Sequence, residues 1–258
     1  TAEFVIVQEA FGHTETCTYA DLLLPATTWG EKEGTVTNSE RAITRVRAAV
    51  SAPGEARHDW AIVVDFARRL GTRLGKGALA ERMFPYTSPE EIWNEHREST
   101  RGRDLDITGM SYAMLEQAGP QQWPFPEGAS AGKVRLYEDG VYPTPTGRAR
   151  FVATEHRITA ESPSAHYPLH LNTGRLRDQW HGMSRTGLVA RLYSHESEPM
   201  LHMHKDDMAR RHLADGDLVK VRSRRGDVVL KVLESATLRA GQCFVPMHWG
   251  ANATGGLG

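Results

Sequence analysis

The sequence Thr173-Gly174-Arg175-Leu176-Arg177-Asp178-Gln179-Trp180-His181-Gly182 decides how the second half of this chain is interpreted. It follows residues 168–172, whose alternating apolar and polar side chains predict a half-buried β-strand. The glycine after the first threonine lets the backbone turn and approach a ligand closely, because it has no Cβ. The arginines offer guanidinium forks to a phosphate, and the tryptophan offers a stacking face for a flat ring. An ordinary polar strand end contains the same short Thr-Gly-Arg motif, so the motif alone leaves both interpretations open.

Short β-prone runs follow this sequence. Residues 218–223 and 228–233 are such runs, and residues 243–249 form a third, with Asp-Gly and Arg-Gly turns between them. Residues 201–213 precede them and have the pattern of a short helix. Short strands joined by tight turns are typical of small β-barrels and sandwiches. We therefore predict a β-rich domain over residues 166–258.

The beginning of the chain predicts an α/β layer. Residues 4–7 and 21–25 are apolar runs typical of buried parallel strands. Gln8 and Glu9 come directly after the first run, at the strand end where open α/β sheets bind ligands. Strands that alternate with helices in this order form layered α/β domains.

A loop and a helix follow the second run. Residues 31–41 are polar and predict a loop, which contains Lys32. Asp59 is the predicted N-cap of a helix that ends at Gly71, because apolar residues recur between them at helical spacing. Residues 76–165 then form a connecting segment without a chemical signal, in which residues 134–142 predict a hairpin and residues 147–151 a strand.

Several of these runs resemble the molybdopterin oxidoreductase family. In the first part the resemblance rests on Thr14–Thr16, Tyr19–Asp21, Leu24–Ala26, Glu31–Gly34 and Asn38–Arg41. In the last part it rests on Thr173–Arg175 with Trp180 and His181, on Ala214–Asp217, and on Phe244–Trp249. The chain is most similar to the C-terminal part of bacterial nitrate reductases of the assimilatory or periplasmic kind.

The resemblance implies three segments. Residues 1–75 correspond to the end of a Rossmann-like α/β molybdopterin-binding domain, and residues 76–165 to a connecting segment. Residues 166–258 correspond to a truncated molybdopterin dinucleotide-binding domain, which is a double-psi β-barrel in the family. The fold class expected is therefore α/β plus β.

The resemblance also implies a molybdenum bis(molybdopterin guanine dinucleotide) cofactor. It carries contacts with that cofactor onto Gln8, Glu9, Lys32 and Asp59, onto residues 173–182, and onto His248. Structural alternatives remain, since Glu9 fits a strand-end charge, Lys32 a loop cation and Asp59 a helix cap alone. No catalytic residue and no metal ligand is assigned to this chain.

A 4Fe-4S cluster is expected only in a preceding part of the protein. Such clusters need several cysteine thiolates, and this chain has two cysteines, Cys17 and Cys243, far apart in the sequence. His202 and His204 could form a metal pair, but no ligand is placed to complete a site, so a solvated segment explains them better. The family's molybdenum ligand lies upstream of the part that this chain resembles.

The predicted activity of the intact protein is the reduction of nitrate to nitrite, with nitrate as substrate and the electron donor left open. Formate dehydrogenase of the same family and a non-catalytic β-barrel binding module are the alternatives. The net charge of −1 gives no sign of a polyanionic partner, and the basic runs lack the interleaved aromatic residues of nucleic-acid binders. No apolar run is long enough to span a bilayer. We expect a cytoplasmic protein, with the periplasm as the alternative, and an isolated chain that is inactive.

Overall fold

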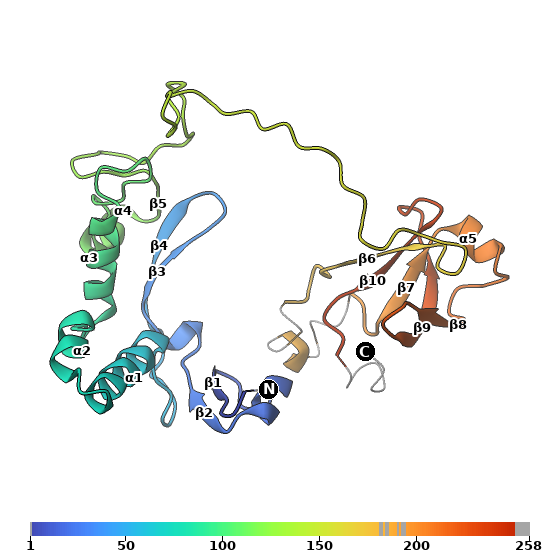
Figure 1. Ribbon diagram of the computed structural model, residues 1–258, viewed down its shortest axis with the longest axis horizontal. Coiled ribbons are helices and arrows are strands. Elements are labelled where there is room, and N and C mark those ends of the chain that lie inside the picture. Colours follow the sequence, from blue (N-terminus) through green and yellow to red (C-terminus); the bar gives the residue numbers. More distant parts are fainter. Residues whose placement is uncertain (1, 181–182, 184–185, 190, 192–194, 251–258) are drawn as a thin grey trace. The chain divides into compact units, whose positions relative to one another are not determined.

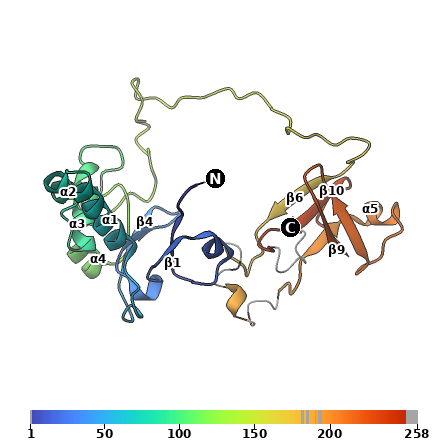
Figure 2. The ribbon, with the colours of Figure 1, turned by 60° about the horizontal axis from the view of Figure 1, so that its bottom comes forward.

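The computed structural model describes residues 2–180, 183, 186–189, 191 and 195–250. The chain forms two compact units, Thr1–Ala153 and Thr154–Gly258 (Figures 1 and 2). Residues 143–165, between the last strand of the first unit and the first strand of the second, contain no helix or strand. The two units are described separately below.

The first unit begins with a parallel strand pair. Strands β1 (Ile6–Glu9) and β2 (Leu22–Pro25) pair in parallel, with Glu9 opposite Pro25, and a 3₁₀ helix at Glu15–Tyr19 connects them. The strand–helix–strand order matches the prediction, but the predicted burial of both runs is wrong, because Phe4, Ile6, Leu22 and Leu23 are between 39% and 61% exposed. A sheet of only two strands has small faces and cannot bury its own apolar side chains.

An antiparallel sheet and four helices complete the first unit. The sheet order is β3 (Gly34–Thr37), β4 (Ala42–Val46) and β5 (Gln121–Gln122). The helices are α1 (Asp59–Arg73), α2 (Gly77–Met83), α3 (Pro89–Ser99) and α4 (Tyr112–Ala118). The predicted polar loop over residues 31–41 is therefore wrong in part, because β3 lies within it. Thr35, Val36 and Thr37 are β-branched and pair with β4, which overrides the polar character of their surroundings.

Helix α1 differs from its prediction at both ends. Its N-cap is His58, and Asp59 is the first helical residue, with its carboxylate bonded to side chains from two other segments. Gly71 lies inside the helix and does not end it. A Cβ built on Gly71 would lie 2.3 Å from the Cβ of Ala80 in α2, so the glycine permits the close approach of the two helices.

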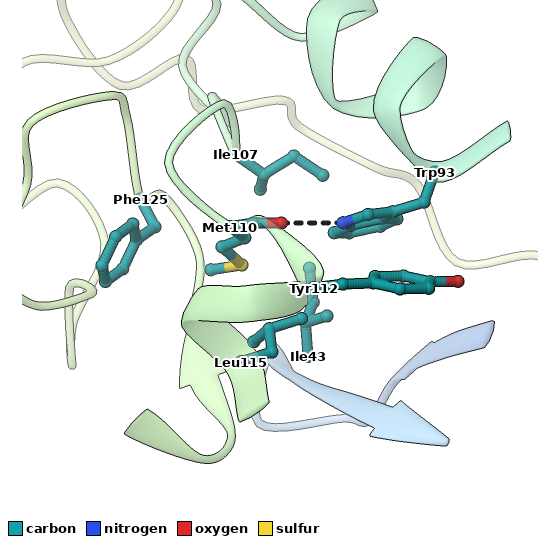
Figure 3. Packing of buried hydrophobic residues seen from close by; sticks show 7 residues of the cluster. All are labelled: Ile43, Trp93, Ile107, Met110, Tyr112, Leu115 and Phe125. Carbon is teal, nitrogen blue, oxygen red and sulfur yellow. Dashed lines mark hydrogen bonds between the residues drawn. The ribbon is translucent and has the colours of Figure 1, made fainter. Parts of the chain in front are cut away.

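The core of the first unit joins β4, α3 and α4 (Figure 3). The indole Nε1 of Trp93 donates a hydrogen bond of 2.7 Å to the carbonyl of Met110, which satisfies the polar atom of this buried ring. The buried side chains are Ile43, Trp93, Ile107, Met110, Tyr112, Leu115 and Phe125. Because residues from 43 to 125 share this core, the antiparallel sheet and the last two helices form one packed body.

The second unit is a five-stranded mixed sheet in the order β6-β10-β7-β9-β8. β10 pairs in parallel with β6, and β7 pairs in parallel with β9, while the other two neighbours are antiparallel. The strands are β6 (His170–Gly174), β7 (Met200–Met203), β8 (Leu218–Arg222), β9 (Asp227–Glu234) and β10 (Gln242–Pro246). The described residues form an open sheet, in which β6 and β8 are the edge strands.

Three other predictions, for residues 134–142, 147–151 and 201–213, need correction. The helix predicted over residues 201–213 begins later, because Leu201 and Met203 alternate inward from β7 and are buried, and α5 (Lys205–Ala209) follows. The hairpin over residues 134–142 and the strand over 147–151 are wrong, since these residues form turns and irregular backbone. Phe151 is 95% exposed, so no packed face holds this segment in a sheet.

Candidate functional site

Three of the predicted cofactor residues meet in the first unit. The Asp59 Oδ1 atom accepts a hydrogen bond of 2.7 Å from Gln8 Nε2, and Asp59 Oδ2 accepts one of 2.6 Å from Lys32 Nζ. Gln8 lies at the carboxyl end of β1, Lys32 follows a 3₁₀ helix at Trp29–Glu31, and Asp59 begins α1. We call these three residues the Asp59 cluster. Their polar side chains come from three segments far apart in the sequence.

The carboxylate of the Asp59 cluster is ionised and reachable. Burial opposes its charge, but hydrogen bonds from Lys32 and Gln8 outweigh burial and lower the pKa of Asp59 below its ordinary value. The Asp59 side chain is 52% exposed and the Lys32 side chain 25% exposed. An ionised carboxylate beside an ammonium and an amide can bind a ligand that presents both hydrogen-bond donors and a phosphate.

Glu9, the fourth predicted contact in this unit, has local partners. Its Oε1 atom accepts hydrogen bonds from the amides of Ala10 and Phe11, at 2.7 and 3.2 Å. Its backbone carbonyl accepts a hydrogen bond from the amide of Ala26 after β2. The structure thus gives the Glu9 side chain a role in the turn that follows β1.

Sequence reasoning missed Trp29, which lies beside the Asp59 cluster. The Lys32 ammonium is 5.7 Å from the centroid of the Trp29 ring, and the Trp29 side chain is half-exposed. An open hollow of 460 Å³ is lined by Glu31, residues 48–52 and His58, which include the residues directly before Lys32 and Asp59. The sequence offered one signal for this contact. Trp29 and Lys32 are three residues apart, and this spacing places two side chains on the same side of a single helical turn.

The remaining predicted contacts form a loop in the second unit. Thr173 and Gly174 end β6 and lie opposite Val245 and Pro246 of β10. A Cβ on Gly174 would lie 3.1 Å from the Phe244 ring, so a glycine at this position lets β6 pack closely on that ring. The loop after β6 is therefore anchored to the end of β10.

His248, which follows β10, connects the end of that strand to the loop after β6. Its Nε2 atom accepts a hydrogen bond of 3.3 Å from the amide of Leu176, and the amide of Met247 donates one of 2.9 Å to the Gly174 carbonyl. His248 has a φ of 103°, in the left-handed region that residues with a Cβ rarely adopt. The structure thus holds His248 against the loop at a cost in backbone strain.

The loop itself presents some side chains and buries others. The Leu176 and Gln179 side chains are buried, and Gln179 Oε1 accepts a hydrogen bond of 2.6 Å from Thr186 Oγ1. The Arg175 guanidinium lies 5.7 Å from the centroid of the Trp180 ring, which is half-exposed.

The loop also contains one ion pair between neighbouring residues. Arg177 donates a hydrogen bond of 2.9 Å to Asp178, and this bond lowers the pKa of the Asp178 carboxyl. The Arg177 side chain itself is mostly exposed. Two of the predicted contacts, His181 and Gly182, lie outside the described residues.

The comparisons with known proteins bear directly on these two groups of residues. Residues 1–69 match the family model described as molybdopterin oxidoreductase, and residues 169–257 match the molydopterin dinucleotide binding domain. The two models together match more than half of the chain and include every residue of the candidate site. The chain belongs to the molybdopterin oxidoreductase family.

Relatives of this molybdopterin oxidoreductase chain extend across both units. A nitrate reductase of Klebsiella oxytoca is 40% identical over 255 residues, which are 95% of this chain and 28% of the relative. An F420-dependent formate dehydrogenase alpha subunit of Methanocaldococcus jannaschii is 36% identical over 247 residues, 96% of this chain and 34% of the relative. This chain therefore spans about a third of the length of the curated relatives it matches.

A solved structure supports the fold. Acetylene hydratase from Pelobacter acetylenicus matches with a TM-score of 0.61 and 18% sequence identity, over 96% of this chain and 33% of that one. At this identity the likeness concerns the fold alone. The two chains therefore share an arrangement of helices and strands over nearly all of this chain.

The residues present fit a molybdopterin dinucleotide, the cofactor to which the matched domain corresponds. In the first unit, Lys32 is a cation of the kind that binds phosphates, and the Asp59 carboxylate has acceptors of the kind that bind ring N–H groups. In the second unit, Arg175 and Arg177 are cations of the same kind. Trp29 and Trp180 supply half-exposed indole faces for flat rings. Among the described residues, no group of three or more His, Cys, Asp or Glu could hold a metal ion, and no helix is long and apolar enough to cross a membrane.

Proposed function

We propose that this chain is the C-terminal, cofactor-binding portion of a molybdenum enzyme that reduces nitrate to nitrite. The observation that carries the proposal is the 40% identity with a nitrate reductase across 95% of the chain. Family membership alone would leave the substrate open, because one molybdenum cofactor serves several reactions. Because the identity extends over both units, we choose the substrate from those of relatives that match nearly the whole chain.

The proposal extends to the cofactor and to the domains. The cofactor is molybdenum bis(molybdopterin guanine dinucleotide), with a 4Fe-4S cluster in the preceding part of the protein. Residues 1–75 belong to the α/β molybdopterin-binding domain, 76–165 to a connecting segment, and 166–258 to a double-psi β-barrel. The parallel pairing of β10 with β6 and of β7 with β9 in a small mixed sheet supports this last assignment.

When bound, the molybdenum cofactor supplies the chemistry of oxygen-atom and electron transfer. The protein binds and orients it. Lys32 and the arginines of the loop neutralise phosphate charge, and the Asp59 carboxylate accepts hydrogen bonds from ring N–H groups of a guanine. The half-exposed Trp180 ring supplies a stacking face, while His248 positions the loop through the Leu176 amide.

Formate oxidation is the second candidate function. The formate dehydrogenase subunit of M. jannaschii is 36% identical over nearly the whole chain, close to the nitrate reductase value. The two relatives therefore differ little in how well they match this portion. We favour nitrate because the identity is higher, and we place the protein in the cytoplasm, with no nucleic acid or membrane among its partners.

The test uses the intact protein, produced in cells supplied with molybdate. We expect the purified protein to reduce nitrate to nitrite with a reduced viologen as electron donor, and to leave formate unoxidised. Protein from cells grown with tungstate is the matched control and should lack nitrate reduction. Formate oxidation without nitrate reduction would replace the first candidate by the second, and the absence of both activities in molybdenum-loaded protein would contradict the proposal.

A further inference from the structure

His248 combines a strained backbone with a hydrogen bond that only its neutral ring can make. Its φ of 103° lies in the left-handed region, which residues with a Cβ rarely adopt. Its half-buried ring accepts, at Nε2, a hydrogen bond of 3.3 Å from the amide of Leu176. His248 follows β10 and Leu176 lies in the loop after β6, so this bond joins segments that are 72 residues apart.

The direction of this bond fixes the protonation state of the ring. A backbone amide can only donate, so the Nε2 atom of His248 has a free lone pair and the single ring proton is on Nδ1. An imidazolium carries a proton on both nitrogens and cannot accept a hydrogen bond. Protonation therefore removes the bond and turns two donors, Nε2–H and the Leu176 N–H, toward each other. An imidazole in water titrates at about pH 6.5, close to physiological pH.

Two further features favour the departure of a protonated His248 from the loop. The strained backbone conformation persists only while the surrounding contacts hold it, and the lost bond is one of these contacts. Residues 175–180 carry two arginines and one aspartate, a net charge of +1, so a positive charge on the ring is unfavourable beside them.

The other charged groups near this bond do not titrate between about pH 5 and pH 8. Arg175 and Arg177 stay protonated. The hydrogen bond from Arg177 lowers the pKa of the Asp178 carboxyl, so Asp178 stays ionised. On β10, burial raises the pKa of the Cys243 thiol to about 11, so the thiol stays protonated.

The histidines of the neighbouring elements have other surroundings. His170 begins β6 and is exposed. His195 precedes β7 and is exposed, and its charge acts on Asp178. His202 lies on β7, with its Nε2 atom 3.5 Å from the Glu196 carboxylate. Within the described part of the chain, His248 is the histidine whose ring accepts a hydrogen bond from the backbone of the loop.

We propose that the hydrogen bond between Leu176 and His248 is a pH-sensitive latch. A neutral His248 holds the loop after β6 against the end of β10, and a protonated His248 releases the Leu176 amide. The buried side chains of Leu176 and Gln179 keep the released loop close to the sheet, so the latch loosens the loop without unfolding it. Weaker cofactor binding at low pH would follow from this, and that consequence alone rests on the proposed function.

Hydrogen exchange in the purified intact protein tests the latch. Amide-resolved mass spectrometry gives the exchange rates at about pH 5 and pH 8, each corrected for the intrinsic effect of pH on exchange. We expect the protection of the Leu176 amide to be about tenfold lower at pH 5, the effect of losing one hydrogen bond. The Met247 amide is the internal control, because it donates to the Gly174 carbonyl at 2.9 Å and should keep its protection.

His248→Gln identifies the group that titrates. The glutamine amide accepts through its oxygen and does not titrate, so the protection of the Leu176 amide should be the same at both pH values. His170→Gln and His195→Gln are matched controls, which should keep the pH dependence of the wild type. His181→Gln is a third control for the loop itself, at a position outside the described residues.

Three results would contradict the latch. The first is equal protection of the Leu176 amide at both pH values in the wild type. The second is a pH dependence that persists in His248→Gln, because another group would then be responsible. The third is a parallel loss of protection at Met247, which would show that the pairing of β6 with β10 opens as a whole. The measurement needs no nitrate and no enzyme activity, so its failure leaves the proposed function standing, and a different substrate would leave the latch standing.

Discussion

At the scale of a single residue, the role of Asp59 in the structure differs from the role that its position in the sequence predicts. Its place before an apolar helix predicts an N-cap, yet His58 is the N-cap and the Asp59 carboxylate bonds Lys32 and Gln8. Local spacing cannot reveal this choice, because the partners lie 27 and 51 residues away. Only the resemblance to the family placed these three residues on one ligand. The structure brings them together, and their contact with the cofactor remains a prediction.

The charge of Asp59 sets the pH range in which it can act. Its folded-state pKa is lowered, so its contribution to stability is present above the unfolded value of about 3.9 and is lost as the pH falls through the lower folded value. Because the side chain is 52% exposed, this contribution is small, about 0.2–1 kcal/mol. Between pH 5 and pH 9 the carboxylate stays ionised, so retention of a ligand through Asp59 should not change with pH in that range.

The substitution Asp59→Asn should therefore reduce cofactor retention without unfolding the protein. It removes a charge-assisted acceptor from the site, which we expect to weaken binding by about 1.5–3 kcal/mol. The molybdenum content of the intact protein after extended dialysis measures the effect. Asp65→Asn is the matched control, because Asp65 lies on the same helix and pairs with Arg57 and Arg69 at the surface. Equal molybdenum content in both variants would remove Asp59 from the site.

At the scale of elements, sequence patterns predicted the presence of several strands and helices. They were less successful in predicting where these elements begin and end and which of their side chains are buried. The runs at 218–223 and 228–233 became β8 and β9, because their turns and β-branched residues act locally. The run at 201–213 was misassigned because it contains the end of β7 and the helix α5 in succession. The alternation of two buried residues in β7 is too short to stand out beside the charged helical residues that follow. The predicted strand at 147–151 failed because no neighbouring strand pairs with it, which is a property of the tertiary fold.

Gly71 gives a test of how α1 and α2 pack. Replacing a helical glycine by alanine should raise helix propensity by about 1 kcal/mol. A Cβ on Gly71, however, would lie 2.3 Å from Ala80 Cβ, and overpacking of this kind costs about 1–3 kcal/mol. We therefore expect Gly71→Ala to lower the free energy of unfolding by up to about 2 kcal/mol, as measured by urea denaturation.

Gly77→Ala is the matched control for this substitution. Gly77 is also a helical glycine, but a Cβ there would meet nothing nearer than 3.4 Å, so the change should be neutral or slightly stabilising. Equal stability of the two variants would show that the helices adjust to a side chain at position 71. The glycine would then have no packing role.

At the scale of the whole molecule, the proposed cofactor contacts are divided between two units. The Asp59 cluster belongs to the unit Thr1–Ala153, and the loop after β6 with His248 belongs to Thr154–Gly258. The prediction of which segments carry the site rested on glycines, cations and indoles at strand ends, which are local features of the sequence, and it remains a prediction. The pairing of β6 with β10, which brings His248 to Leu176, joins residues 72 positions apart and could not be predicted from local pattern.

This division leads to a prediction about the 258 residues produced alone. The proposed cofactor contains two large dinucleotides, which would bind through many contacts, and this chain spans about a third of the length of its curated relatives. Partial grooves bind weakly, because desolvation and ordering costs are then met by too few contacts. We expect the isolated chain to purify without molybdenum, by metal analysis, and to show no nitrate reduction with reduced viologen. The intact protein prepared in parallel is the control. Nitrate reduction by the isolated chain at a rate that tracks bound molybdenum would show that these two units hold the complete site.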